Sequence, residues 1–173
     1  MKTRKIAAVA LVLLLAGCGG EGQGDSQNSP RSNPQACGKP TSAGGMNTSE
    51  LSTVTIYASS GEKVRVRVEI ADSYLSRVSG LRGRESLPEN RGMLFVYSEE
   101  DLPSYTMADT PIPLSIAFID SERRIIDIQD MKPFNDEPPG YTSPEPVQYA
   151  LEVNKGFYDE RGVEVGDCLT LPE

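Results

Sequence analysis

The stretch GMLFVYSEEDLPSYTMADTPIPLSIAFID, residues 92–120, decides the fold predicted for this chain. Two apolar runs, residues 93–97 and 116–119, flank a polar segment and are rich in β-branched and aromatic side chains, which is typical of buried strands. Pro111 and Pro113 cannot lie in a helix interior or a central strand, so their segment is extended or turning. The stretch therefore predicts two buried strands joined by an irregular connection.

The residues before this stretch predict a strand and a short helix. Residues 64–70 alternate between apolar and charged side chains, as expected of a strand with one buried face. Arg65 and Arg67 lie on its polar side, which favours a solvated face over a ligand patch. Asp72 and Ser73 offer an N-cap, and Gly80 can end the helix in the left-handed conformation. Four apolar residues fall at helical spacing between them: Tyr74, Leu75, Val78 and Leu81.

The residues after this stretch predict more strands around a long loop. Strands are expected at residues 124–128, 147–153 and 165–171, with a helical turn at 157–161 capped by Asn154. The loop at residues 131–146 is rich in proline, and long loops in small domains are often functional or mobile.

These elements predict a mainly β (α+β) domain over residues 53–173, with six or seven strands and two short helices. The hairpin-like spacing indicates mostly antiparallel pairing. Because an open sheet leaves edges to protect, we expect a small closed or nearly closed barrel. The length is sufficient for a single core.

The N-terminus has the pattern of a bacterial lipoprotein signal. Basic residues precede an apolar run at residues 6–16, which is too short to span a bilayer and ends in Leu15-Ala16-Gly17-Cys18, a lipobox. We therefore expect a signal peptide at residues 1–17, lipidation of Cys18, and anchorage of the protein to a membrane of the cell envelope. The alternative is an ordinary signal peptide with an accidental cysteine. Gly19 favours the outer membrane if the cell has two membranes.

Residues 18–52 predict a flexible tether, because they are dominated by Gly, Ser, Asn, Gln, Pro and Thr and have no apolar periodicity. With Cys18 acylated, Cys37 and Cys168 remain in an oxidising compartment, where a disulfide between them is expected. The alternative is a free Cys168 that packs as a small apolar residue.

Composition excludes several classes of function. The chain has a net charge of −8, which disfavours nucleic acid as a partner because phosphate binding needs clustered Lys and Arg. It has no histidine, which excludes Ser-His-Asp and Cys-His catalysis and removes the commonest zinc ligand. The cysteines lack metal-ligand spacing and no EF-hand pattern is present, so no metal or cofactor is expected.

Several short motifs stand in one order and at consistent spacing in the chain: Gly80-Leu81, Arg84-Glu85-Ser86-Leu87-Pro88, Gly92-Met93-Leu94-Phe95, Met107, Thr110, Ile112-Pro113-Leu114, Ile116-Ala117-Phe118-Ile119-Asp120, Leu151-Glu152-Val153-Asn154 and Gly166-Asp167. Together they resemble the domain-of-unknown-function 192 family over about residues 64–169. The resemblance implies a small, barrel-like, often exported β domain with no settled activity. The chain departs from the family at residues 106–110, which read Thr-Met-Ala-Asp-Thr instead of Trp-Met-Lys-Asn-Thr, and at Ser115, where the family has Asp.

The sequence favours a binding module over an enzyme. Arg82 and Arg84 form a cationic spot in an acidic domain, suited to a carboxylate or phosphate, and with Met107, Asp109 and Thr110 they are the candidate binding face. The ligand would be an envelope protein or a small polar or anionic molecule. For Arg84 the alternative is a structural ion pair or helix cap.

Two other functions stay open. A histidine-free enzyme would rely on carboxylates, and the candidate acids are Asp109, Asp120, Asp127 and Asp130, but nothing in the sequence indicates that two of them converge. A purely structural envelope protein is the third reading.

Overall fold

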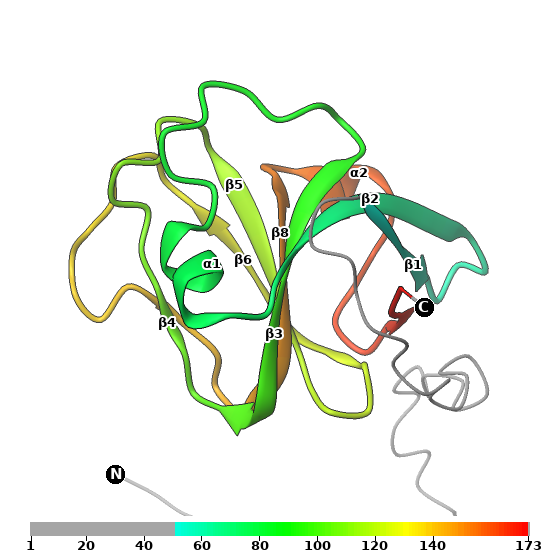
Figure 1. The fold of residues 1–173 in the computed structure, drawn as a ribbon. Coiled ribbons are helices and arrows are strands. Elements are labelled where there is room, and N and C mark those ends of the chain that lie inside the picture. Colours follow the sequence, from blue (N-terminus) through cyan, green and yellow to red (C-terminus); the bar gives the residue numbers. More distant parts are fainter. Residues whose placement is uncertain (1–50, 173) are drawn as a thin grey trace, which may run out of the picture. The chain divides into compact units, whose positions relative to one another are not determined.

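The computed structural model describes residues 51–172, in which seven strands form one curled sheet and two short strands form another (Figure 1). The strands are β1 (Ser52–Tyr57), β2 (Lys63–Ala71), β3 (Arg91–Asp101), β4 (Ser104–Tyr105), β5 (Leu114–Ile119), β6 (Ile125–Met131), β7 (Tyr141–Thr142), β8 (Val147–Asn154) and β9 (Cys168–Thr170), and the helices are α1 (Tyr74–Ser79) and α2 (Phe157–Glu160). The large sheet has the order β6-β5-β8-β3-β2-β1-β9, and β4 pairs with β7.

The large sheet is a mixed half-barrel rather than a purely antiparallel one, and it is not closed, so the expected closed or nearly closed barrel is wrong. Strands β2 and β3 pair in parallel because α1 and the loop after it carry the chain back between them. At the far ends of the sheet, Arg124 before β6 and Cys168 of β9 form an isolated bridge. Strand β9 is much shorter than the run at 165–171 suggested, so no continuous ladder closes the half-barrel.

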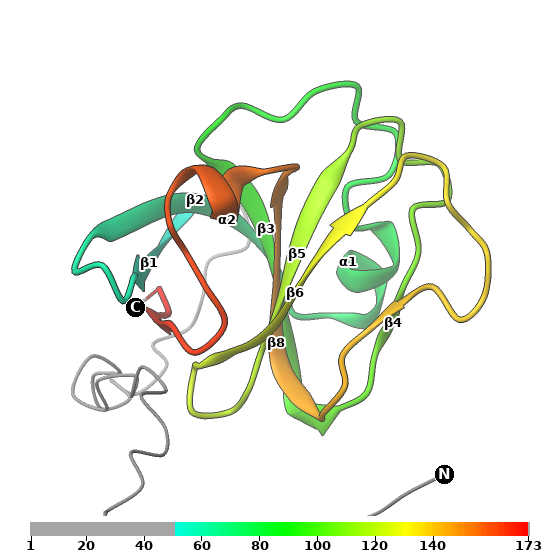
Figure 2. The same cartoon turned by 180° about the vertical axis from the view of Figure 1, so that it is seen from behind.

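Two apolar cores lie on opposite faces of this sheet. One contains the inward side chains of β1 and β2 together with Phe157 and Tyr158 of α2. The other contains Phe95, Phe118 and the covering residues Leu81, Tyr105 and Met107. Figure 2 shows α2, β1 and β2 on one side of the central strands, and α1 and β4 on the other. The central strands β5 and β8 are therefore covered on both faces, and every residue of β5 is buried.

Several local predictions are confirmed. Strand β2 alternates as expected, with Val64, Val66 and Val68 buried and the charged residues between them exposed. Ser73 caps α1 through a capping box with Ser76. Gly80 ends the helix as expected and has a positive φ of 49°, but its ψ of −137° lies outside the left-handed helical region that was expected. The apolar runs at 93–97 and 116–119 lie in β3 and β5.

The helix α1 differs from an ordinary amphipathic helix, because none of its residues is buried. Tyr74, Leu75 and Val78 are exposed by 74%, 76% and 50%. Helical spacing predicted where the helix forms, but these side chains do not pack into the core.

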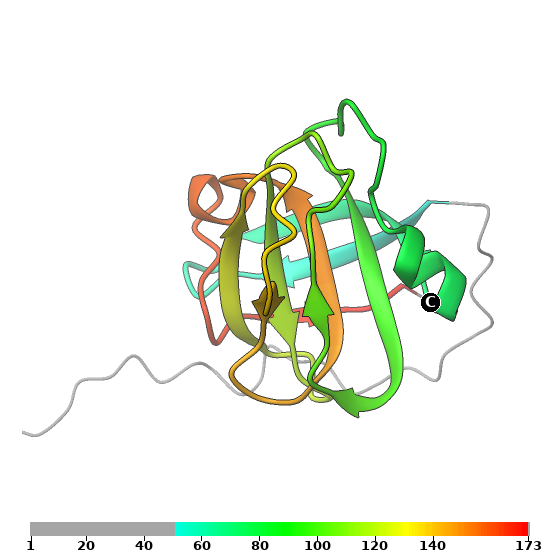
Figure 3. The same ribbon diagram turned by 90° about the vertical axis from the view of Figure 1, so that its left-hand side faces the viewer.

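The proline-rich loop is more ordered than expected. It contains β7 and the cis peptide bond between Pro138 and Pro139, and the amide of Met107 donates to the carbonyl of Asn135 at 2.8 Å. Figure 3 shows β4 and β7 side by side across one face of the large sheet. This small sheet covers the second core.

Two further details complete the domain. Gly156 takes the N-cap position of α2, and Asn154 instead donates to the carbonyl of Leu87 at 2.8 Å, tying the loop before β3 to the end of β8. Among residues 51–172, no helix has the length and apolar character needed to cross a membrane.

Candidate functional site

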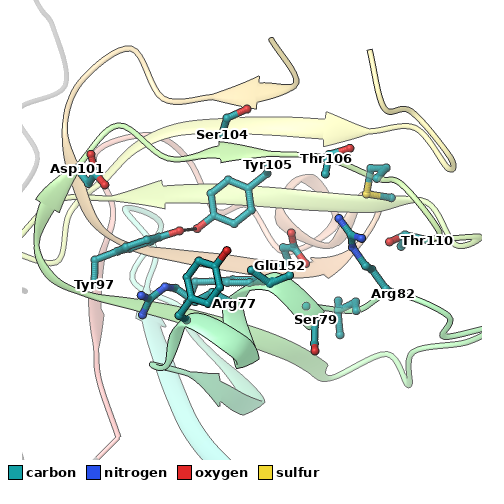
Figure 4. Close-up of a pocket in the computed structure, with 16 residues that line it drawn as sticks. Arg77, Ser79, Arg82, Tyr97, Asp101, Ser104, Tyr105, Thr106, Thr110 and Glu152 are labelled. Carbon is teal, nitrogen blue, oxygen red and sulfur yellow. Dashed lines mark hydrogen bonds between the residues drawn. The ribbon is translucent and has the colours of Figure 1, made fainter. Parts of the chain in front are cut away.

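A pocket of about 430 Å³ opens between α1, the β3 strand and β4 (Figure 4). Its walls come from α1 and the turn after it, from β3, and from the segment that runs from Ser104 to Thr110. Glu152 of β8 also lines it. Since β8 is a central strand, this side chain reaches the pocket from the middle of the large sheet.

Glu152 is the unusual group of this pocket. It pairs across the sheet with Met93 of β3 on one side and with Ile116 of β5 on the other. The residue is only 5% exposed, and its carboxyl group has no hydrogen bond or ion pair with any residue in the described part of the chain. Burial raises the pKa of Glu152 to about 8. A carboxyl group without a partner thus faces the pocket from an apolar surface.

A tyrosine pair forms one wall. The hydroxyls of Tyr97 and Tyr105 are 2.8 Å apart, and the Tyr105 ring packs edge-on against Phe95 at a centroid distance of 5.1 Å. Burial raises the pKa of both tyrosines, so both hydroxyls stay protonated at neutral pH. In the view of Figure 4 the Glu152 carboxyl group lies between this pair and Arg82.

Arg77 connects α1 to β3. Its guanidinium donates to the carbonyls of Asp72 at 2.6 Å and Val96 at 2.9 Å, and its Cζ atom lies 4.9 Å from the centre of the Tyr97 ring. This arginine therefore holds the helix over the pocket.

The predicted binding face is only partly assembled at this pocket. Arg82, Met107 and Thr110 line it, while Asp109 and Arg84 do not. The Arg82 guanidinium lies 3.9 Å from the exposed carboxylate of Asp109, which has a left-handed backbone with a φ of 59°. The pocket thus brings together three of the five predicted residues.

Arg84 makes a structural ion pair instead. Its two terminal nitrogens each donate to a carboxylate oxygen of Glu69 at 2.6 Å, a bidentate arrangement that lowers the pKa of Glu69. This is the alternative that the sequence left open for Arg84. Arg84 therefore does not line this pocket together with Met107 and Thr110.

The candidate acids of the sequence do not converge. Asp130 accepts from the Ser115 hydroxyl at 2.6 Å and lies 3.4 Å from Lys155, while Asp120 accepts from the amide of Arg124 at 2.8 Å. Burial raises the pKa of Asp120, yet Asp120 does not line the pocket. Within residues 51–172, no group of three or more His, Cys, Asp or Glu could hold a metal ion.

Sequence reasoning missed Glu152. The spacing of Val147, Tyr149, Leu151 and Val153 in the sequence predicts one inward apolar face for this strand, which would leave Glu152 towards solvent. The structure covers both faces of β8, so the face with Ala150 and Glu152 is buried as well. The small apolar Ala150, two residues before Glu152 and therefore on the same face, was the sequence feature that could have indicated burial of this face.

Cys168 is buried in β9 and disulfide-bonded. Its partner lies outside the described residues, as do Cys18 and Cys37, so the pairing with Cys37 stays a prediction.

A second, more open depression of about 530 Å³ is cationic. Lys63, Arg65, Arg67 and Arg161 contribute to it. Arg65 and Arg67 are exposed on the outer side of β2, as the alternating pattern indicated.

Comparisons with known proteins give a family without an assigned activity. Residues 55–171 match DUF192, described as an uncharacterized ACR. The UPF0127 protein PF1050 of Pyrococcus furiosus is 26% identical over 116 residues, which cover 63% of this chain and 90% of that protein.

Two solved structures share the fold. A Sinorhizobium meliloti 1021 protein, provisionally named a transcription regulator, superposes with a TM-score of 0.68 at 31% identity, covering 73% of this chain and 98% of that one. A protein of unknown function from Novosphingobium aromaticivorans DSM 12444 has a TM-score of 0.65 at 29% identity, covering 69% and 84%.

Proposed function

Because the chain belongs to the uncharacterized DUF192 family, we propose its function from its own pocket: the domain binds a small ligand between α1 and the β4–β7 sheet. The observation that carries this proposal is the buried, unpaired carboxyl group of Glu152. Desolvation of this carboxyl group penalises its charged form, so the ionised residue lowers the stability of the folded domain. A fold that keeps such a group at a pocket has a use for it there.

The composition of the pocket supports the same function. Ligand sites in proteins are mostly apolar with a few convergent polar groups, and a volume of about 430 Å³ falls in their usual range. The apolar part here comes from Leu81, Phe95 and Met107, and the polar part from Glu152 and the tyrosine pair. The exposed apolar residues Tyr74 and Val78 extend the apolar lining along α1.

We also propose that the domain works at the cell envelope as a lipid-anchored protein. The support is the lipobox ending at Cys18, followed by residues 18–52 as a tether. In a cell with two membranes, Gly19 favours the outer one.

Ligand binding in the pocket is tested by filling the pocket with a larger side chain. The full-length chain is incubated with a small-molecule extract of its native cells, and bound compounds are identified by native mass spectrometry. Val78, 50% exposed, lines the pocket, and Val165, 58% exposed, does not. We expect a compound retained by the wild type and by Val165→Trp, and lost from Val78→Trp. A folded wild type that retains nothing, or equal retention by Val78→Trp, would contradict the proposal and favour a structural role.

A carboxylate-dependent enzyme is the second candidate function. The observation that favours it is a carboxyl group in a pocket with a pKa of about 8, close to the value that suits a general acid or base at neutral pH. Conversion of the retained compound by the wild type but not by Glu152→Gln would establish an enzymatic function. Recovery of the compound unchanged would support binding without catalysis.

The name of the Sinorhizobium protein does not extend to a DNA-binding role for this chain. The sequence has 25 Asp and Glu against 17 Lys and Arg, which disfavours binding to a phosphate backbone.

A further inference from the structure

Resting on the proposed function, we propose that the ligand carries a cationic nitrogen group, such as an amine, amidine or guanidine, and that this group binds the carboxylate of Glu152 in the pocket. The sequence suggested an anionic ligand because of Arg82 and Arg84. In the structure Arg84 is bound to Glu69 and Arg82 lies beside Asp109, so both arginines have carboxylates of their own.

No described protein group donates a hydrogen bond to Glu152, so a bound ligand would have to supply the donor. An ionised carboxylate accepts several hydrogen bonds and donates none. Its cross-strand neighbours, Met93 and Ile116, offer apolar side chains, and no described residue donates to it. The oxygens are not sealed in, because the described domain has no fully buried polar side-chain atom without a partner. The open direction is therefore the pocket.

The walls suit a cation. Phe95 and Tyr105 present aromatic rings to the pocket, and such rings attract ammonium, amidinium and guanidinium groups. Charge-assisted hydrogen bonds to a carboxylate are also stronger than neutral ones.

The two arginines that line the pocket, Arg77 and Arg82, do not form an ion pair with Glu152 in place of a cationic ligand. Arg77 is committed to two backbone carbonyls and to the Tyr97 ring. A cation close to Glu152 would lower the pKa of its carboxyl group, whereas burial is the one influence that acts on it, and it raises the pKa to about 8. Neither Arg77 nor Arg82 thus compensates the carboxylate.

Binding of a cation is then coupled to release of one proton. The free carboxyl group is mostly protonated at pH 7, and in the complex its O–H proton passes to solvent as the ion pair forms. Affinity scales with the ionised fraction, so it rises about tenfold from pH 6 to pH 7 and about fivefold from pH 7 to pH 8.

Few other groups change charge in this range. Burial keeps Tyr97, Tyr105 and, on the other core face, Tyr158 protonated, because it raises the pKa of each. The chain has no histidine. Other ionisable groups lining the pocket are Tyr74 and Arg77 of α1, Arg82 after it, and Asp101 of β3, and β5 faces Glu152 with the apolar Ile116.

Three probes of one shape test the proposal: benzamidinium, neutral benzamide and anionic benzoate. Each is titrated into the ¹⁵N-labelled full-length chain at pH 6, 7, 8 and 9, with amide shifts near the pocket as the readout. We expect benzamidinium to bind best at pH 9, about twofold more tightly than at pH 8, with affinity falling by the stated factors from pH 8 towards pH 6. Glu152→Gln should lose at least tenfold in benzamidinium affinity at pH 8 and lose the pH dependence.

Asp101→Asn is the control, since Asp101 is the other acidic residue lining the pocket; it should keep the pH dependence. Stronger binding of benzamide or benzoate, benzamidinium affinity independent of pH, or loss of the dependence in Asp101→Asn would overturn the assignment to Glu152. If no probe binds but Val78-dependent retention of a cellular compound persists, the cationic class fails and the ligand site stands. If that retention also fails, the proposed function fails with it.

Discussion

At the scale of single residues, the buried carboxyl group of Glu152 lowers the stability of the folded domain and lines the pocket proposed to bind a ligand. Its position in β8 places the carboxyl group between apolar neighbours on a covered face of the sheet. The protonated form tolerates this surrounding better than the anion does. Residues that break the local rules of burial without a compensating partner are expected at functional sites.

The first prediction is that the domain loses stability from pH 6 to pH 8. The pKa of Glu152 is about 8 in the folded chain against an ordinary 4.5, so the native state holds a proton that the unfolded state releases. Stability falls as pH rises between these values, by up to about 1.4 kcal/mol per pH unit. Urea unfolding at pH 6, 7 and 8 measures it, and Glu152→Gln should remove the slope. A wild-type slope equal to that of the variant would contradict the raised pKa.

The second prediction concerns the pair of Arg84 and Glu69. The pair is bidentate but partly solvated, so we expect a coupling free energy of about 1 kcal/mol or less from a double-mutant cycle of Arg84→Ala and Glu69→Ala. Probe binding at the pocket should stay unchanged, because neither residue lines it. Loss of binding in Arg84→Ala with unchanged stability would restore Arg84 to the site.

At the scale of elements, α1 is held by its ends and by Arg77, since none of its residues is buried. Ser73 and Ser76 satisfy the first turn, and Arg77 ties the helix to β3. Elements with few buried apolar contacts open at low free energy. The helix that flanks the pocket is therefore the element expected to open most readily.

The third prediction is that Ser73→Ala speeds hydrogen exchange in α1. Loss of an N-cap costs about 1 kcal/mol, and the helix has little packing to compensate. Exchange in β5 and β8 should change much less, as measured by mass spectrometry. Ser79→Ala is the matched control, because the Ser79 hydroxyl makes no hydrogen bond within residues 51–172. Equal effects of the two substitutions would show that the cap does not hold the helix.

At the scale of the whole molecule, the disulfide bond of the described domain lies near the C-terminal end of the chain. Cys168 lies in β9, at one edge of the sheet, and is disulfide-bonded. The chain has three cysteines, and an acylated Cys18 would leave Cys37 as its partner.

The fourth prediction is a disulfide between Cys37 and Cys168. Peptide mapping of the non-reduced protein should recover the linked peptides, and Cys168→Ser should lower the free energy of unfolding by about 2–5 kcal/mol. Cys37→Ser should have the same effect. Recovery of Cys168 linked to Cys18 would contradict both this pairing and the lipid anchor.

The fifth prediction concerns anchoring. Cys18→Ser should leave an unprocessed precursor, while the wild type carries a diacylglyceryl group on Cys18 and stays with the membrane, because several acyl chains together bind firmly. Mass spectrometry of the mature N-terminus measures it. A mature, unlipidated terminus at another residue would show that residues 1–17 form an ordinary signal.

The sequence by itself determined the local elements. Alternation predicted β2, the apolar runs predicted β3 and β5, and Ser73 and Gly80 predicted the ends of α1. These features depend on neighbours along the chain, on backbone preferences and on capping, which a single sequence contains. The motifs also predicted the family, which the comparison confirms.

Three features depend on the tertiary structure: the parallel pairing of β2 with β3, the open half-barrel and the pocket. Strand pairing and the covering of a sheet face depend on contacts between segments far apart in the sequence, which an apolar pattern does not record. The pattern of β8 showed one apolar face, but Leu81, Tyr105, Met107 and Tyr141 pack in the core that covers the other. Because this second face of β8 is also covered, Glu152 is buried and lines the pocket, although the sequence pattern indicated a surface residue.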